Sequence, residues 1–212
     1  MIPINIILYF LLFEVCNCFL FPVKLKQFFN IYKSPIISIE VYNGINTRGI
    51  SSFITNERYG ILPNNQYNEM IGMIERDFSY RRKNCFSKLP FTILVAIKDD
   101  NVVGVITVEC CDIDIYEKKE NHPVISNLIV SSKMRRKGIA KSLTIRAEKI
   151  VKSFYYKKIY LFVNKENIPA IQLYKSRGYK SIVDEKQSTR IIFQNNRFRN
   201  VECVNFMMSK RL

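Results

Sequence analysis

The chain has 212 residues, enough for one domain with an appendage and for a sizeable buried core. Its 33 Lys and Arg residues outnumber 18 Asp and Glu and give a formal net charge of +15, which suits an anionic ligand, an acidic peptide or nucleic acid. The sequence has no zinc-ligand spacing, no RNP-like aromatic pattern and no repeated basic helix, so we expect no specific nucleic-acid partner.

The N-terminus begins with an apolar leader. Residues 2–13 are almost entirely apolar, and Glu14 then interrupts the run. This run is too short to cross about 30 Å of hydrocarbon comfortably. The small pair Cys16 and Cys18 follows it, as in a secretory signal, although the usual positive n-region is missing. We predict a signal peptide or signal anchor over residues 1–18, with membrane attachment only if this leader is retained.

Residues 19–58 have a different, basic and acid-poor composition. A signal followed by such a segment is typical of a two-part address to a plastid or apicoplast through the secretory pathway. A membrane-anchored or cytoplasmic protein is the alternative. The partly alternating residues 36–42 also fit a first strand of the following domain, and the two interpretations can overlap. We predict one folded domain over residues 59–212.

Hydrophobic periodicity predicts an α/β domain with no internal repeat. A helix or helix pair is expected over residues 66–83, and the charged residues 112–122 are expected to form a long hairpin loop. The predicted strands, bounded by turn residues, lie at 91–97, 102–108, 124–130, 159–163, 190–193 and 204–208. Two further helices are predicted. The one at 138–154 has amphipathic spacing, and the one at 167–178 begins with a capping residue, Asn167.

Cysteine and histidine are too sparse for a metal centre. The chain has six Cys and one His and lacks a Cys-x-x-Cys pair, so we expect no metal. Adjacent Cys110 and Cys111 on a strand would point to opposite faces and are poor disulfide partners. Reduced, partly buried thiols are typical of a reducing compartment.

The run Arg135-Arg136-Lys137-Gly138-Ile139-Ala140 follows a predicted strand and opens a predicted helix. Glycine lets the backbone approach a ligand closely. The first amides of a helix lack intrahelical partners and carry the positive end of the helix dipole, so they attract phosphate. The sequence therefore predicts that this turn binds a pyrophosphate through its main chain.

A second motif follows at Asn167-x-x-Ala170-x-x-Leu173-Tyr174-x-x-x-Gly178-Tyr179. The two motifs, in this order and with room for one helix and one strand between them, resemble the signatures of the GNAT acyl-CoA N-acyltransferases. Within that family the chain is most similar to plastid-type protein N-acetyltransferases. They share short sequence motifs with it, such as Ile-Ser-Asn-Leu-x-Val and a Phe-Met-Met sequence in the last strand.

The resemblance implies the GNAT fold: a central mixed, mostly antiparallel sheet of about six to seven strands, a splay between two parallel central strands, and helices on both faces. It also implies acetyl-CoA as the co-substrate and an amine of a protein or peptide as the acceptor. The implied acetyl-CoA-binding residues are Leu128, Ile129, Val130, Arg135, Arg136, Lys137, Gly138, Ile139, Ala140, Lys141, Asn167 and Tyr174.

The resemblance also assigns proton transfer. Tyr174 matches the tyrosine that often protonates the departing thiolate, and packing at a helix–sheet junction is its alternative role. Phe162 occupies the position at which some bacterial relatives carry a glutamate that acts as the general base, so that base is absent here. Glu109 at a strand end is the candidate base, acting through water, whereas His122 fits a solvated loop better. A dedicated base is not required, since water or backbone carbonyls can accept the proton.

We therefore expect an acetyl-CoA-dependent N-acetyltransferase acting on protein N-terminal α-amines and possibly lysine ε-amines. An α-amine, with a pKa near 8, is substantially neutral without a base, whereas lysine near 10.4 needs more help. The alternatives are a small-amine acetyltransferase, with Asp112, Asp114, Glu117 and Glu120 forming an acidic cleft, and a degenerate domain that binds acyl-CoA without turnover.

Overall fold

The computed structural model describes residues 37–212 except 45, 116 and 117. The predicted signal and the start of the transit-like segment lie outside the described residues, so both stay predictions. Residues Ile37–Leu212 form one compact unit. The folded domain thus includes its first strand and a helix before residue 59, because Ile50 and Ile54 of that helix are buried in the core.

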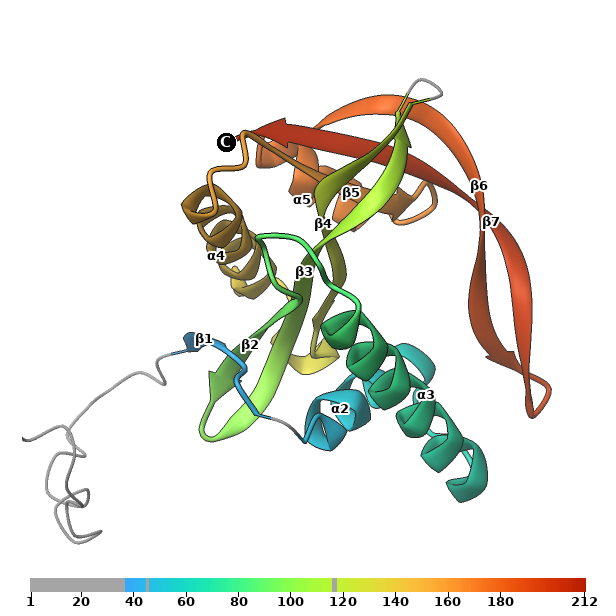
Figure 1. Ribbon diagram of the computed structural model, residues 1–212. Helices are drawn as coiled ribbons and strands as arrows, with labels where there is room; N and C mark the ends of the chain where they lie inside the picture. Colours follow the sequence, from blue (N-terminus) through green and yellow to red (C-terminus); the bar gives the residue numbers. More distant parts are fainter. Residues whose placement is uncertain (1–36, 45, 116–117) are drawn as a thin grey trace, which may run out of the picture. The chain divides into compact units, whose positions relative to one another are not determined.

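Seven strands form a single curled sheet (Figure 1). In chain order they are β1 (Ser38–Val41), β2 (Thr92–Lys98), β3 (Asn101–Ile115), β4 (Lys118–Val130), β5 (Lys158–Asn164), β6 (Lys180–Gln194) and β7 (Arg197–Arg211). Their order in the sheet is β1-β2-β3-β4-β5-β7-β6. All neighbours are antiparallel except β4 and β5, which confirms the predicted mixed, mostly antiparallel sheet.

The parallel pair β4–β5 is joined over a very short length. Its register consists of Val124 opposite Tyr160 and Ile125 opposite Leu161. Beyond Ile125, β4 continues to Val130 beside β3 alone, and β5 continues to Asn164 beside β7. The two central strands therefore splay apart, and the last five residues of β4 have no partner in β5.

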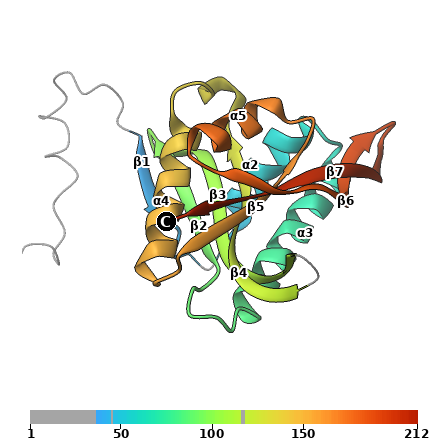
Figure 2. The same cartoon turned by 90° about the horizontal axis from the view of Figure 1, so that it is seen from above.

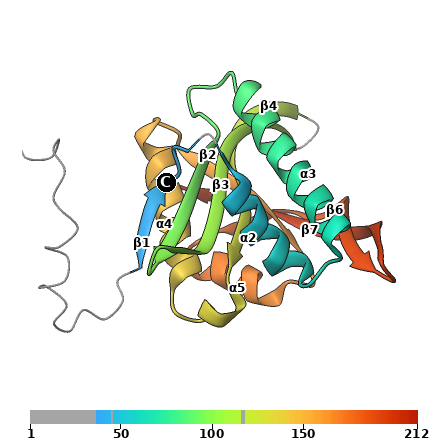
Figure 3. The same ribbon diagram turned by 90° about the horizontal axis from the view of Figure 1, so that it is seen from below.

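Helices cover both faces of the sheet, as predicted. They are α2 (Arg48–Tyr59), α3 (Asn64–Lys83), α4 (Ile139–Ser153) and α5 (Ile168–Ser176), with a 3₁₀ turn, η3, at Ser132–Met134. Figure 2 shows α4 and α5 in front of the sheet, and Figure 3 shows α2 and α3 in front of its other side. Two separate apolar clusters fill these layers, one containing Leu143 of α4 and one containing Phe78 of α3.

Helix α4 packs very closely on β3. A Cβ placed on Gly104 would lie 3.0 Å from side-chain atoms of both Ile139 and Leu143, so only glycine fits without a shift. This close approach fixes the first turn of α4 against the sheet, at the level where β4 ends. Gly104 therefore helps to place the predicted pyrophosphate turn.

The predicted loop at residues 112–122 is wrong, because most of this segment is strand. β3 and β4 run on as a two-stranded ribbon in which Asp114 lies opposite Lys119 and Cys111 opposite His122. Cross-strand pairs of opposite charge stabilise such a ribbon, and the ribbon buries Ile113 despite its charged neighbours. His122 stacks on Tyr160, with ring centroids 4.7 Å apart, instead of lying in a solvated loop.

The last two strands are much longer than predicted. β6 and β7 form a hairpin that curves away from the sheet and returns towards the end of α2 and the start of α3 (Figure 1). At the turn of this hairpin, the carbonyl oxygen of Asn196 accepts a 2.8 Å hydrogen bond from Gln66 Nε2. Tyr59 meets Phe198 edge to face, at 5.7 Å between centroids. In the described part of the chain, no helix is long and apolar enough to cross a membrane.

Candidate active site

A cavity of about 650 Å³ lies where β4 ends and α4 begins. β4 supplies one wall, the turn and first residues of α4 another, and one side of α5 a third. Ten of the twelve predicted acetyl-CoA-binding residues line it: Leu128, Ile129, Val130, Arg135, Arg136, Gly138, Ile139, Ala140, Lys141 and Asn167. The structure thus brings together residues that are up to 39 positions apart in the sequence into one concave site, flanked by Glu57 and Arg58 of α2.

The N-terminus of α4 offers unpaired main-chain donors to this cavity. The helix begins at Ile139, has no side-chain cap and has no acidic residue in its first turn. Gly138 precedes it with φ 79° and ψ −1°, a left-handed conformation that suits glycine. The first amides of this 15-residue helix are therefore available to an anion, at the positive end of the helix dipole. Arg135, Arg136 and Lys141 add positive charge at the same wall.

The end of β4 supplies a second set of main-chain groups. Leu128, Ile129 and Val130 line the cavity. Val130 and Ile129 pair with β3 on one side, and the splay leaves the other side of the strand without a partner in β5. An extended ligand can pair with such an unpartnered edge in the way that an added strand does. The diphosphate end and the extended arm of one ligand thus have adjoining sites.

Lys137 and Tyr174 do not line this cavity. The Lys137 ammonium is exposed and lies 3.6 Å from the Met134 sulfur. Tyr174 belongs to the apolar core, and its ring meets Tyr179 edge to face at 5.5 Å. Burial raises the pKa of Tyr174 above the usual range of a phenol, so the hydroxyl stays protonated near neutral pH. Leu173, which precedes it, and Ser176, two residues further on, do line the cavity.

Asn167 has the capping role. Its side-chain oxygen accepts a 3.2 Å hydrogen bond from the Ala170 amide, and Pro169 occupies the first turn of α5. A cap of this kind satisfies one of the four orphan donors of the helix. Asn167 also lies on the cavity wall, so the capping position and the predicted ligand position coincide.

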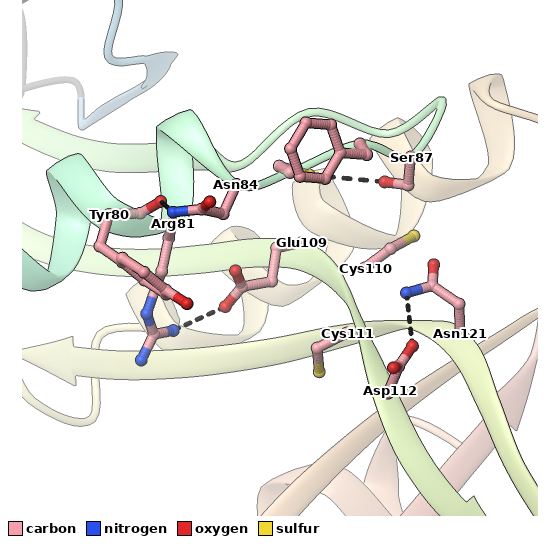
Figure 4. A pocket seen from close by; sticks show the side chains of 11 residues that line it. Tyr80, Arg81, Asn84, Ser87, Glu109, Cys110, Cys111, Asp112 and Asn121 are labelled. Carbon is pink, nitrogen blue, oxygen red and sulfur yellow. Dashed lines mark hydrogen bonds and ion pairs between the residues drawn. The ribbon is translucent and has the colours of Figure 1, made fainter.

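A second cavity, of about 510 Å³, lies between the end of α3 and strands β3 and β4 (Figure 4). Arg81 of α3 and Glu109 of β3 meet here in an ion pair of 2.6 Å between Nη1 and Oε1. Burial raises the pKa of Glu109 above its ordinary value, and the Arg81 charge offsets this only in part. Arg81 also pairs with Asp77 through Nε at 2.9 Å.

Cys111 lines the same cavity but is not a nucleophile there. Burial, followed by the charge of Glu109, raises the pKa of the thiol to about 11. A thiol with this pKa is almost entirely protonated at neutral pH, and only the thiolate reacts. Among the described cysteines, Cys85, Cys110, Cys111 and Cys203 are free, and the described residues hold no cluster of three or more His, Cys, Asp or Glu side chains that fits a metal ion.

A chain of polar contacts connects the two cavities. From Arg81, Nη1 reaches the Ser126 hydroxyl at 3.4 Å. That hydroxyl lies 2.7 Å from the hydroxyl of the fully buried Thr107, to which Asn127 Nδ2 donates at 3.2 Å. Asn127 Oδ1 in turn accepts a 2.7 Å hydrogen bond from Arg58. The contacts run across β3 and β4 at the point where β4 leaves β5.

The sequence analysis missed most members of this chain of contacts. Arg58 lay in the predicted transit-like segment, and Arg81 at the end of a predicted helix carried no motif. Ser126 and Asn127 were the exception that could have been noticed, because two polar residues interrupt an apolar strand between Ile125 and Leu128. Such an interruption is typical of a β-bulge.

Comparisons with known proteins agree with this geometry. A sequence model of the Acetyltransferase (GNAT) family matches residues 61–179. The chain therefore belongs to the GNAT acetyltransferase family, as the two sequence motifs predicted. The family uses acetyl-CoA as its acyl donor.

Individual relatives share either part of the sequence or the fold. GCN5-related N-acetyltransferase 4, chloroplastic, of Arabidopsis thaliana is 31% identical over 98 residues, which are 43% of this chain. The chain spans about a third (34%) of the length of this curated relative. The structure of Arabidopsis thaliana NAA60 in complex with acetyl-CoA has a TM-score of 0.56 at 15% identity, covering 84% of this chain and 99% of that one.

A third relative is the ribosomal-protein-S18-alanine N-acetyltransferase of Escherichia coli. Its TM-score is 0.55 at 12% identity, with coverage of 83% of this chain and 94% of that chain. At these identities the two solved structures show a common fold.

Proposed function

We propose that the protein transfers an acetyl group from acetyl-CoA to the N-terminal α-amines of proteins or peptides, and more slowly to lysine ε-amines. The observation that carries the proposal is that two sets of free main-chain groups, at the N-terminus of α4 and at the edge of β4, adjoin in one cavity. The uncapped N-terminus of α4 suits the diphosphate, and the unpartnered edge of β4 suits the extended pantetheine arm.

In this proposal the chain orients the thioester and the amine and moves two protons. A main-chain amide of residues 128–130 stabilises the negative charge that develops on the thioester carbonyl oxygen. The amine nitrogen bonds to the carbonyl carbon as the carbon–sulfur bond breaks. The thiolate then takes a proton from Tyr174, and the phenolate that this leaves is reprotonated from solvent. Because the Tyr174 ring is buried beside the cavity-lining Leu173, this step requires the hydroxyl to become accessible to the sulfur when the thioester binds. The amine loses its proton to water or, through water, to Glu109.

The Arg81–Glu109 ion pair supports the preference for α-amines. A carboxylate already held at 2.6 Å by a guanidinium is a poorly available base. An acceptor that is substantially neutral on its own, with a pKa near 8, needs less help than lysine. Two of the similar structures, NAA60 in complex with a bisubstrate analogue and the S18-alanine enzyme, fit this acceptor class by their names.

The β3–β4 ribbon does not favour the alternative of a small-amine acetyltransferase, because its acidic residues lie beside lysines. Asp112 has Lys119 at 3.8 Å, and Glu120 has Lys118 at 2.5 Å, so local lysines balance these carboxylates. Asp114 lies opposite Lys119 in the register, and Glu117 lies outside the described residues. An acidic cleft for a polyamine would need carboxylates that are not matched in this way.

The test is turnover by the full chain on a matched peptide panel. One peptide has a free N-terminus and no lysine, its partner has a blocked N-terminus and one lysine, and spermidine represents small amines. We expect the first peptide to react fastest. Reaction of the blocked peptide alone would contradict the α-amine proposal, and binding of acetyl-CoA without any product would show a non-catalytic domain.

For localisation we propose a plastid. The chloroplastic relative and the predicted two-part address support this. Fusion of residues 1–58 to a fluorescent protein would test it, with retention in the secretory pathway as the outcome against it.

A further inference from the structure

The last turn of α2 makes two contacts, one with β4 and one with the 3₁₀ turn that follows it. The Arg58 guanidinium donates a 2.7 Å hydrogen bond to Asn127 Oδ1. The Glu57 carboxylate accepts a 2.8 Å hydrogen bond from the Ser132 amide. These two contacts bracket Leu128–Val130, the segment that lines the candidate acetyl-CoA site, and both Glu57 and Arg58 also lie on the wall of that cavity.

Asn127 is the bulged residue of β4. The register with β3 passes from Thr107 opposite Ser126 to Val105 opposite Ile129, so β4 has one extra residue at this point. Asn127 has φ 53°, in the left-handed region, which a non-glycine residue rarely adopts. A bulge of this kind turns the following peptide groups relative to the rest of the strand. The orientation of the main chain after residue 127 therefore depends on the conformation of Asn127.

The side chain of Asn127 is held at both ends. Its oxygen accepts from Arg58, and its amide nitrogen donates to the hydroxyl of buried Thr107. The two partners come from opposite directions, one from α2 and one from β3. With both bonds made, the side chain cannot rotate without losing a partner, and the left-handed backbone is stabilised from outside the strand.

We propose that Arg58 is a positioning residue of the acyltransferase: through Asn127 it fixes the peptide groups of Leu128–Val130 in the orientation that the thioester requires. The inference rests on the proposed acetyl-CoA site. It assigns to α2 a role in the chemistry, although none of the residues of α2 carries a proton or a nucleophile in the reaction. Loss of Arg58 should then lower the rate of the chemical step more than the binding of acetyl-CoA.

The experiment compares three variants of the full chain with the wild type. Arg58→Ala removes the external hydrogen bond, and Asn127→Gly keeps the left-handed backbone while removing the held side chain. The third variant combines both changes. Arg48→Ala is the matched control, because it removes an exposed arginine from the other end of the same helix.

We expect amide hydrogen exchange of residues 127–132 to become at least about tenfold faster in Arg58→Ala and in Asn127→Gly, with the other strands unchanged. The kcat should fall about tenfold in each, while the dissociation constant of acetyl-CoA changes less than about threefold. The double variant should resemble either single variant, because both changes break the same contact. Arg48→Ala should leave exchange and kcat unchanged.

Two results would overturn the proposal. Unchanged exchange of residues 127–132 in both single variants would mean that Arg58 does not hold the bulge. A weaker binding of acetyl-CoA in Arg58→Ala that adds to the effect of Asn127→Gly would mean that Arg58 contacts the ligand directly. The exchange measurement needs no acceptor, so a failure of the proposed function, seen as no turnover by the wild type, is distinguishable from a failure of this inference.

Discussion

The two cavities of this protein share strands β3 and β4 but are built by different means. The cavity at the splay is lined mainly by one nearly continuous stretch, residues 128–141, to which one side of α5 and the end of α2 are added, and this stretch carries free main-chain groups at the edge of β4 and the N-terminus of α4. The cavity at Glu109 is formed by side chains from α3, β3 and β4 that are up to 41 positions apart. A main-chain site depends on local conformation and leaves a recognisable motif, whereas a side-chain site depends on how distant elements pack.

Because the two cavities are built differently, we expect them to have different roles in the reaction. The cavity at the splay provides donors that are fixed in place before any ligand arrives, which is the condition for stabilising developing charge. The Glu109 cavity holds an ion pair whose partners are already satisfied. Substitutions near the splay should therefore change activity strongly, and those near Glu109 only weakly.

The largest effect is expected at Tyr174, behind the splay. Tyr174→Phe keeps the buried ring and removes only the hydroxyl, so turnover should fall on the order of 10²-fold if that group protonates the thiolate. The kcat and kcat/KM should fall together, with acetyl-CoA binding and melting temperature little changed. Because burial raises the pKa of Tyr174, wild-type turnover should not decline through its ionisation below about pH 10.

Tyr179→Phe is the control for this change, since it removes a second buried phenol 5.5 Å away that does not line the cavity. Equal losses in both variants would show a packing effect. A rise in KM at constant kcat in Tyr174→Phe would make Tyr174 a binding residue instead of an acid.

The next effect is expected at Gly138, where the main chain should meet the diphosphate. Gly138→Asp places a carboxylate at the N-terminus of α4, and acetyl-CoA affinity should fall at least about tenfold, or about 1.4 kcal/mol. Titration calorimetry of the folded variant measures this. Gly138→Asn is the matched control, because asparagine has the same shape and tolerates the left-handed conformation equally well.

The comparison of aspartate with asparagine isolates charge from backbone strain, since both residues meet no atom within 4 Å at the Cβ position. If both variants bind acetyl-CoA as tightly as the wild type, the turn does not hold the phosphates, and the proposed site would have to be abandoned.

A smaller effect is expected at Glu109. Glu109→Gln should lower turnover only about fivefold, because a neutral α-amine needs little help from a base. Its contribution requires the carboxylate, so it is present above the pKa of Glu109 and lost as the pH falls through it. As burial raises that pKa, this loss begins at a higher pH than for an ordinary glutamate. It adds to the fall in kcat/KM that protonation of the acceptor α-amine causes below about pH 8, and Glu109→Gln should remove only the added loss.

Asp112→Asn serves as the control, since it neutralises another carboxylate of the same cavity and should leave the pH profile unchanged. A drop of 10²-fold or more in Glu109→Gln would reverse the contrast between the two cavities and would make Glu109 the principal base.

The smallest effect is expected at Asn167 and concerns stability. Asn167→Ala removes the cap of α5 and should lower the free energy of unfolding by about 1 kcal/mol, whereas Asn167→Ser should restore most of it. Chemical denaturation measures both. Acetyl-CoA affinity should change less than about threefold in either variant, and a tenfold loss in Asn167→Ser would reveal a direct contact with the ligand.

The parts of the site that depend on local conformation could be predicted from the sequence, and the parts that depend on the packing of distant elements could not. Arg135, Arg136 and residues 138–141 line one cavity, because a glycine in a left-handed turn before a helix fixes the main-chain donors locally, and their role in binding acetyl-CoA stays a prediction. Tyr174 was assigned to the same group from its motif, yet its ring lies in the core, since the motif sets its position on α5 but not the depth at which α5 packs. Arg81 carries no local signal, and its contact with Glu109 requires α3 to lie across β3.

The sequence by itself determined the strand–turn–helix at residues 128–141, the capped helix that begins after Asn167, and with them the family. These features depend on interactions between residues that are close along the chain, so composition and spacing suffice. The tertiary structure alone decided that residues 112–115 extend β3 and residues 118–122 extend β4, that α2 belongs to the folded domain, and that Arg58 reaches Asn127. Each of these depends on a partner far along the chain: Tyr160 and Met207, which pack with Ile113 of the ribbon, the apolar core for Ile50 and Ile54, and a bulge 69 residues away from the arginine that holds it.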